Sequence, residues 1–313
     1  MNGLHFLATG RCLPASVLTN DDLSQMVDTS DEWITTRTGI KQRYICRGER
    51  HIDLAEGAAR TAMERAGIRP EELGAVVVAT FSPEFSSPTT ACLLQSRLGL
   101  PEGIPMLDLN GACAGFLYAL QVARGLLMQS DKRCALVLGC EVITPLLDFT
   151  DRTTCVLFGD GAAAAVVELD LERLYVSDFG SRSSETMIQV PGAAYPGRSS
   201  VHMDGRAVFR FAVEIIPQCM DRMLQKAGLA QEQIDWFVFH QANHRILEHV
   251  IRKRGLDPDK VYQNMARYGN TSAASIPLAL DEMNEQGLFQ PGQRVLSVGF
   301  GAGLTWGGAL WTW

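Results

Sequence analysis

Cys113 is the best candidate nucleophile in the sequence, because it stands in the run Gly-Ala-Cys-Ala-Gly at residues 111–115. This run follows a strand-like apolar segment and opens a predicted helix of small residues. A thiol at a helix N-terminus lies near the positive end of the helix dipole, which is expected to lower its pKa and favour the thiolate. The free backbone N–H groups there can stabilise an oxyanion. A buried structural cysteine is the alternative, and it is our interpretation of the other seven cysteines.

His240 and Asn270 are the candidate partners of this thiol. His240 ends an apolar segment and precedes the polar turn Gln-Ala-Asn. The ends of strands in α/β proteins face the crevices where ligands bind. Asn270 lies in the segment YGNTSAAS, which leads into a second small-residue helix. The alternatives are a hydrogen-bonded core histidine and a turn or cap asparagine. His244 and His249 are expected on the surface of the next helix.

An internal repeat positions these residues. Residues 65–78 (RAGIRPEELGAVVV) match residues 226–239 (KAGLAQEQIDWFVF) at an offset of 161, and residues 110–120 match residues 270–280 at an offset of 160. The first pair reads as a helix, a glycine stop, a short loop and an apolar strand. The repeat predicts an α/β fold of two duplicated halves, with Cys113 and Asn270 at the mouths of equivalent helices.

The boundary between the halves is predicted after the apolar strand that ends at residue 170, which gives halves 1–170 and 171–313. The Ser-, Gly- and Pro-rich stretch 177–200 is predicted to be an exposed excursion. A length of 313 residues is typical of a chain with about two domains.

Composition excludes several classes of protein. Apolar residues make up 46% and charged residues 20% of the chain, so wholesale disorder is excluded. The net charge of −7 argues against nucleic-acid binding by the whole surface. The eight cysteines show no CxxC pair or zinc spacing, which favours a reducing compartment and no metal. No signal sequence or apolar run of about 20 residues is recognised, so we expect a cytoplasmic protein with no membrane partner.

The Gly-rich segment VGFGAGLTWGG at residues 298–308 lacks the pattern of a phosphate loop. A nucleotide-binding module is therefore a weak alternative. We expect this segment to form a strand-turn-strand that brings backbone N–H groups to the site.

Six segments together resemble β-ketoacyl-acyl carrier protein synthase III, a family of the thiolase superfamily. They are TSDEWITTRTGI (29–40), DLNGACAGFLYAL (108–120), DRTTCVLFGDGA (151–162), HQANHRI (240–246), YGNTSAASIP (268–277) and FGAGLTWGGAL (300–310). The resemblance implies a five-layered αβαβα fold, a homodimer and a catalytic triad of Cys113, His240 and Asn270. It implies condensation of an acyl-CoA primer with malonyl-acyl carrier protein, initiating fatty acid synthesis, with no metal or redox cofactor.

The resemblance also implies binding residues. Trp33 and Arg152 match the pair that sandwiches the CoA adenine, and Arg37 matches a phosphate contact. The positions along the pantetheine channel are Gly205, Phe209 and Asn243. The backbone N–H groups of Cys113 and Ala302 match the oxyanion hole. Without the motifs, a core tryptophan and surface arginines are the alternative.

Docking of an acidic carrier protein to this acidic chain needs a local basic patch. Arg245 and Arg210 match basic contact positions of the family, and Arg252 and Lys253 extend the patch along one predicted helix. The alternative is a solvated charged face. Ser87 stands where acetyl-preferring members carry phenylalanine in the acyl pocket, which suggests room for longer or branched primers. Phe85 or Leu147 could refill that space.

Two other functions remain open at this stage. A secondary-metabolite condensing or acyl-transfer enzyme would keep the fold and the triad but change the acceptor. A non-catalytic partner akin to a chain-length factor is less favoured, because such proteins have usually lost the nucleophile and this chain has Cys113.

Overall fold

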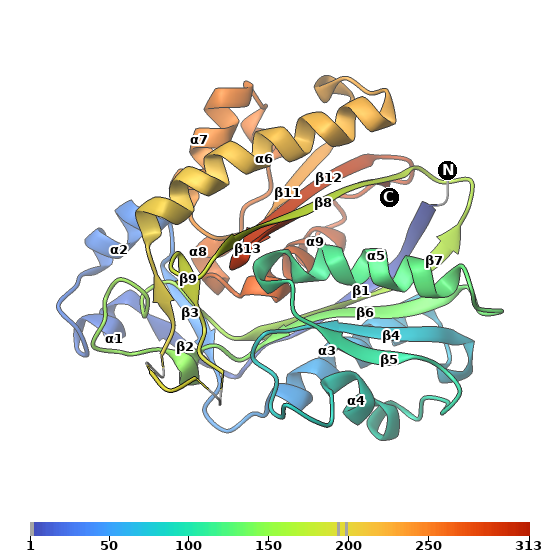
Figure 1. Cartoon of the computed structure of the whole chain (residues 1–313), viewed down its shortest axis with the longest axis horizontal. Coiled ribbons are helices and arrows are strands. Elements are labelled where there is room, and N and C mark those ends of the chain that lie inside the picture. Colours follow the sequence, from blue (N-terminus) through green and yellow to red (C-terminus); the bar gives the residue numbers. More distant parts are fainter. Residues whose placement is uncertain (1–2, 193–194, 198–199) are drawn as a thin grey trace.

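The computed structural model describes residues 3–192, 195–197 and 200–313, and these residues stack in five layers of helix, sheet, helix, sheet and helix (Figure 1). One sheet has the order β1-β7-β6-β4-β5 and the other has the order β8-β13-β12-β11. The strands of the first are β1 (Gly3–Cys12), β4 (Leu73–Ala79), β5 (Met106–Leu109), β6 (Cys134–Glu141) and β7 (Gly161–Asp170). Those of the second are β8 (Tyr175–Ser184), β11 (Trp236–Phe239), β12 (Arg294–Gly301) and β13 (Gly303–Thr312).

The helices form the three other layers. The middle layer holds α5 (Gly115–Leu127) and α9 (Ser275–Glu285), and the outer layers hold α3 (His51–Ala66) with α4 (Thr90–Leu98), and α6 (Gly205–Ala227) with α7 (His244–Arg254). The shorter elements are β2 (Ser16–Thr19), β3 (Gln42–Ile45), β9 (Ile188–Gln189), β10 (His202–Met203), α1 (Asn20–Ser24), α2 (Asp31–Thr38) and α8 (Met265–Tyr268).

The two sheets repeat one topology. In each, two neighbouring strands run parallel (β4 with β6, and β11 with β12), and the next two positions are antiparallel. Helices α3 and α6 both end at a glycine in the left-handed conformation, Gly67 at φ 65° and Gly228 at φ 66°. The predicted five-layered fold of duplicated halves is confirmed. The proposed division at residue 170 falls in the turn between β7 and β8.

The strand β8 corrects one expectation. Residues 177–184 belong to this strand and pair with β13, although residues 177–200 were predicted to be an exposed excursion. The polar composition of residues 177–184 indicated an exposed segment, but Asp178 is buried and forms an ion pair with Arg222. The excursion begins only after Ser184.

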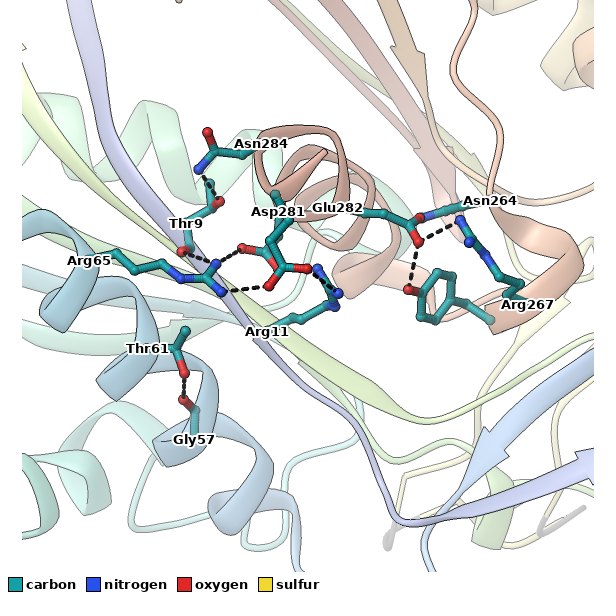
Figure 2. Close-up of polar contacts among 12 residues, drawn as sticks. Thr9, Arg11, Gly57, Thr61, Arg65, Asn264, Arg267, Asp281, Glu282 and Asn284 are labelled. Atoms are coloured by element: carbon teal, nitrogen blue, oxygen red, sulfur yellow. Dashed lines mark hydrogen bonds and ion pairs between the residues drawn. The ribbon is translucent and has the colours of Figure 1, made fainter. Parts of the chain in front are cut away.

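The middle helix α9 is fixed to both halves of the molecule. Arg11 and Arg65 come from β1 and α3 and both contact the buried Asp281 carboxylate, at 2.6 Å and 2.9 Å (Figure 2). The same two guanidinium groups contact Glu285 at 2.5 Å and 2.6 Å. The next residue, Glu282, points the other way, to Asn264 and Arg267. These contacts hold the C-terminal half of α9 in place relative to the first sheet.

Candidate active site

Two equivalent turns, which we call the elbows, carry the predicted residues. The N-terminal elbow is residues 110–115, and the C-terminal elbow is residues 270–275. In the first, the Asn110 side-chain oxygen accepts the Ala112 N–H at 3.0 Å, and Ala112 has φ 46°. In the second, the Asn270 oxygen accepts the Ser272 N–H at 2.9 Å, and Ser272 has φ 48°. A positive φ in a residue other than glycine is strained.

A cavity of about 230 Å³ brings the predicted triad together. Its wall includes Cys113 from the N-terminal elbow, Asn270 from the C-terminal elbow and His240 from the end of β11. Predicted residues Ala302, Gly205, Phe209 and Asn243 also line it. The sequence analysis missed most of the apolar wall, which includes Phe81, Leu157, Phe158, Ile188, Val190, Val201, Met203, Val208 and Phe300. An apolar cavity around a thiol suits an acyl chain.

The thiol of Cys113 differs from the expectation in two ways. It lies in a short 3₁₀ turn, residues 112–114, and the α-helix begins only at Gly115. Burial raises its pKa to about 12, and the charge of Glu141 also raises it, while a hydrogen bond with Ser272 lowers it. The expected lowering of its pKa is therefore wrong. The apolar wall outweighs the helix dipole, so Cys113 is a thiol at neutral pH and must lose its proton during the reaction.

His240 is a neutral imidazole in this site. Burial lowers its pKa to about 3, so the ring carries no charge in the physiological range. Its Nδ1 atom lies 2.7 Å from the hydroxyl of Ser275, the first residue of α9. The ring of Phe300 meets it edge-on with 5.3 Å between the ring centroids. Ser275 and Phe300 thus hold the ring, and its Nε2 atom is left for chemistry.

The segment after β12 lies close to the backbone of the nucleophile. A Cβ atom at Gly301 would lie only 2.7 Å from the Cys113 backbone nitrogen. Only glycine can bring the chain this near, which places Ala302 on the same cavity wall as Cys113. The predicted strand-turn-strand at residues 298–308 is confirmed as β12 and β13.

The predicted adenine site is formed by a stack of three side chains outside the cavity wall. The guanidinium carbon of Arg37 lies 4.5 Å, and that of Arg152 5.1 Å, from the centre of the Trp33 ring. Arg152 is also held by Asp28, through its backbone oxygen at 2.8 Å. A flat cation–π stack of this kind can exchange an arginine face for a purine face.

Two of the basic residues predicted for docking, Arg245 and Arg252, share one surface. Arg245, His249 and Arg252 line a shallow depression on α7 with Phe209 and Glu248. Arg210 and Lys253 are exposed nearby in sequence on α6 and α7. Glu248 places a carboxylate in this surface and contacts His244 at 3.1 Å. The depression adjoins the cavity through Phe209, which lines both.

Ser87 lies apart from these residues. It is exposed, as is Phe85, and neither is among the described residues that line the cavity. Leu147 is buried and is likewise outside that wall. The role of Ser87 in a partner's acyl pocket stays a prediction.

Within the described residues, no group of three or more His, Cys, Asp or Glu side chains is placed to hold a metal ion. None of the helices in the described part of the chain has the length and apolar character needed to cross a bilayer.

Comparisons with known proteins identify the family. Residues 107–183 match the family of 3-oxoacyl-[acyl-carrier-protein] synthase III, and residues 224–313 match its C-terminal domain. A β-ketoacyl-[acyl-carrier-protein] synthase III of Clostridium acetobutylicum is 42% identical over 100% of this chain and 99% of its own length. The chain belongs to the β-ketoacyl-acyl carrier protein synthase III family.

Other members of the family agree over the same length. An enzyme of this name from Neisseria meningitidis is 44% identical over 96% of this chain and 97% of its own. The crystal structure of the 3-oxoacyl-[acyl-carrier-protein] synthase III of Aquifex aeolicus superimposes with a TM-score of 0.94 at 39% identity, covering 99% of this chain and 100% of that one. The family's fold therefore extends over 99% of this chain.

Proposed function

We propose that this protein is a β-ketoacyl-acyl carrier protein synthase III that joins an acyl-CoA primer to malonyl-acyl carrier protein and so initiates type II fatty acid synthesis. The observation that supports it best is that Cys113, His240 and Asn270 line one apolar cavity. A non-catalytic partner would have no use for a nucleophile in this place. Family membership supports the same reaction.

The first half-reaction is acyl transfer. Cys113 loses its proton to solvent, the thiolate sulfur attacks the thioester carbonyl of acyl-CoA, and CoA leaves as a thiolate that takes up a proton. The oxyanion of this step is stabilised by the backbone N–H groups of Cys113 and Ala302. Since the thiol pKa is raised, only a small fraction of Cys113 is thiolate at neutral pH, and the rate of attack rises as that fraction grows with pH.

The second half-reaction is decarboxylative condensation. Malonyl-acyl carrier protein loses CO₂, and the electron pair of the broken bond forms an enolate whose oxygen lies near His240 and Asn270. We assign the ring proton of His240 to Nε2, with the Ser275 hydroxyl donating to Nδ1 across 2.7 Å, so that Nε2 donates to that oxygen. The side-chain amide of Asn270 is the second donor. The enolate carbon then attacks acyl-Cys113, and the C–S bond breaks to release β-ketoacyl-carrier protein and the Cys113 thiolate, which takes up a proton from solvent.

The binding assignments extend this proposal. Arg152 and Trp33 take the adenine of CoA between them, Arg37 contacts a phosphate, and Gly205, Phe209 and Asn243 line the pantetheine channel. The acidic carrier protein docks on Arg245, Arg210, Arg252 and Lys253. We further propose a homodimer in the cytoplasm, a cavity opened by Ser87 to primers longer than acetyl, and catalysis with no cofactor beyond the two substrates.

Intact-mass spectrometry tests the proposal. The protein is mixed with acetyl-, butyryl-, isobutyryl- and octanoyl-CoA, with the Cys113→Ala variant alongside. A mass gain of one acyl group in the wild type, missing in the variant, supports Cys113 as the nucleophile. The range of chain lengths accepted then tests the assignment of Ser87. If no primer increases the mass of the wild type, the proposal that acyl-CoA acylates this protein is wrong.

A further inference from the structure

The backbone packing around the two elbows is nearly the same. Gly139 in β6 and Gly299 in β12 are equivalent by the repeat, and each faces an elbow at close range. A Cβ atom at Gly139 would lie 2.2 Å from the carbonyl oxygen of Ala273, and one at Gly299 would lie 3.1 Å from that of Cys113. Ala273 is thus the counterpart of Cys113, and the ends of β6 and β12 press on equivalent turns.

Two residues after Gly139 and Gly299, the two strands carry different residues. The end of β12 carries Gly301, beside the Cys113 amide and on the cavity wall. The end of β6 carries Glu141, which is fully buried. The backbone amide of Ala273 is among the polar groups that lower the pKa of the buried Glu141 carboxyl. A carboxylate therefore faces the amide that matches one side of the proposed oxyanion hole.

The Glu141 carboxyl group is held firmly on its other side. Its Oε2 atom accepts from the backbone N–H groups of Phe81 and Ser82, both at 3.2 Å, and from the hydroxyls of Thr80 at 3.1 Å and Ser82 at 2.5 Å. Its Oε1 atom is buried and has no hydrogen-bond partner among the described residues. One oxygen thus fixes the loop whose Phe81 lines the cavity, and the other is left for the C-terminal elbow.

The C-terminal elbow touches the nucleophile's elbow directly. A Cβ atom at Gly115 would lie 3.3 Å from that of Ala273, and the nearby Ser272 side chain lowers the pKa of the Cys113 thiol. The charge of Glu141 raises the pKa of Cys113 across this contact. Other titratable groups around Glu141 are Cys140 on its own strand and His51, which reaches it through Thr80. Burial keeps the pKa of His51 lowered, so that ring is neutral.

We propose that Glu141 is a positioning residue, whose carboxylate takes beside Ala273 the place that a substrate oxyanion takes beside Cys113. This inference rests on the proposed function. The Glu141 carboxylate fills the site beside Ala273 and keeps substrate out of it. It also holds the C-terminal elbow, which includes Asn270, in a fixed position relative to Cys113. The active half leaves the equivalent place open because Gly301 has no side chain.

The Glu141→Gln variant tests this assignment. The donors of the 80–82 loop will claim the amide oxygen, so the NH₂ group faces Ala273, where it cannot accept a hydrogen bond. We expect kcat of condensation to fall about tenfold while KM for acyl-CoA stays within about twofold. Glu141→Asp keeps the charge but withdraws the carboxylate by one methylene, and the same fall in kcat is expected.

Alkylation of Cys113 by iodoacetamide gives a second readout that needs no substrate. Burial raises the pKa of Glu141 to about 7, so the charge that raises the pKa of Cys113 forms as pH increases. The rate ratio of Glu141→Gln to wild type should be near one at about pH 6 and rise severalfold by about pH 8.5. The control variant Asp178→Asn removes a buried carboxylate of β8. It should lower Tm, while its own alkylation rate divided by that of the wild type should not vary with pH.

Unchanged kcat in both Glu141 variants, or a ratio that does not vary with pH, overturns the inference. If no acyl-CoA acylates the wild type but the ratio still rises with pH, the proposed reaction fails and the contact between Glu141 and the elbows stands.

Discussion

The N-terminal elbow and the C-terminal elbow share a backbone but not a chemistry. Both have an asparagine that accepts the N–H two residues ahead and a residue with φ near 47°, at 46° and 48°. One presents a thiol to an apolar cavity, and the other presents an alanine to a buried carboxylate. The repeat therefore contains two strained turns of the same shape. The residue at the neighbouring strand end, Glu141 on β6 or Gly301 on β12, determines which turn can contact substrate.

The largest expected effect comes from moving the nucleophile between elbows. Cys113→Ala should lower primer acylation by more than about 10³-fold, since the covalent step is lost. Adding Ala273→Cys to this variant should not restore it, because Glu141 faces that position. Intact mass after incubation with acyl-CoA checks both variants. Acylation at residue 273 would show that the elbows are interchangeable.

His240 gives the second-largest expected effect. The repeat places Ala79 at the equivalent strand end of the N-terminal half, so only the C-terminal half carries an imidazole at this position. His240→Ala should lower condensation by about 10² to 10³-fold through loss of a donor to the enolate. Initial rates with malonyl-acyl carrier protein, with acylation of Cys113 measured separately, give the split between half-reactions. Equal loss in both would assign His240 to deprotonation of the thiol instead.

The helices behind the elbows differ too, because α9 has Asp281 where α5 has Gln121. Asp281→Asn leaves Arg11 and Arg65 short of a buried anion and should cost about 3 kcal/mol of stability. Urea unfolding of the variant measures this. The matched change Gln121→Ala removes a weak contact to Ser177 and should cost less than about 1 kcal/mol.

The pH dependence of the two half-reactions follows from the two pKa shifts. The raised pKa of Cys113 predicts acylation by acyl-CoA that rises with pH, by at most about tenfold per unit, up to the alkaline limit of protein stability. Since burial lowers the pKa of His240 to about 3, its neutral form persists on acidification, and no loss of decarboxylation assignable to His240 is expected between about pH 5 and 8. Single-turnover rates across pH test both. An acid limb removed by His240→Gln would show that the ring titrates.

The smallest effect concerns backbone strain. Glycine adopts a positive φ without the steric cost that alanine and serine bear, so Ala112→Gly and Ser272→Gly should each raise stability by up to about 1 kcal/mol. Thermal unfolding of each variant measures it. Destabilisation of both would mean that the Cβ contacts outweigh the strain.

Much of the architecture was predictable because it follows from local rules. The repeat, the glycine stops at Gly67 and Gly228, and the strands around residues 73–79 and 134–141 all appear in sequence as apolar runs and turn signals. The candidate triad was predicted from the type and setting of Cys113, His240 and Asn270, and the structure places them on one cavity.

What sequence could not show is how buried each group is. The pKa of Cys113 was predicted with the wrong sign because the apolar wall comes from segments such as 188–190 and 201–208, distant in the chain. The sequence analysis did not single out Glu141, since its hydrogen-bond donors at residues 80–82 are brought to it only by the packed sheets. Strand β8 was missed because polar residues such as Asp178 find buried partners on α6.

The arginine cluster under α9 has a consequence for the order in which the chain folds during synthesis. Arg11 and Arg65 precede Asp281 by 270 and 216 residues. Both cations leave the ribosome long before their anion exists, so these two charges stay hydrated until α9 emerges. Strands β12 and β13 follow α9 in the chain. The catalytic cavity therefore assembles only after these elements are synthesised, and until then the early half is the species that a nascent-chain chaperone would have to shield.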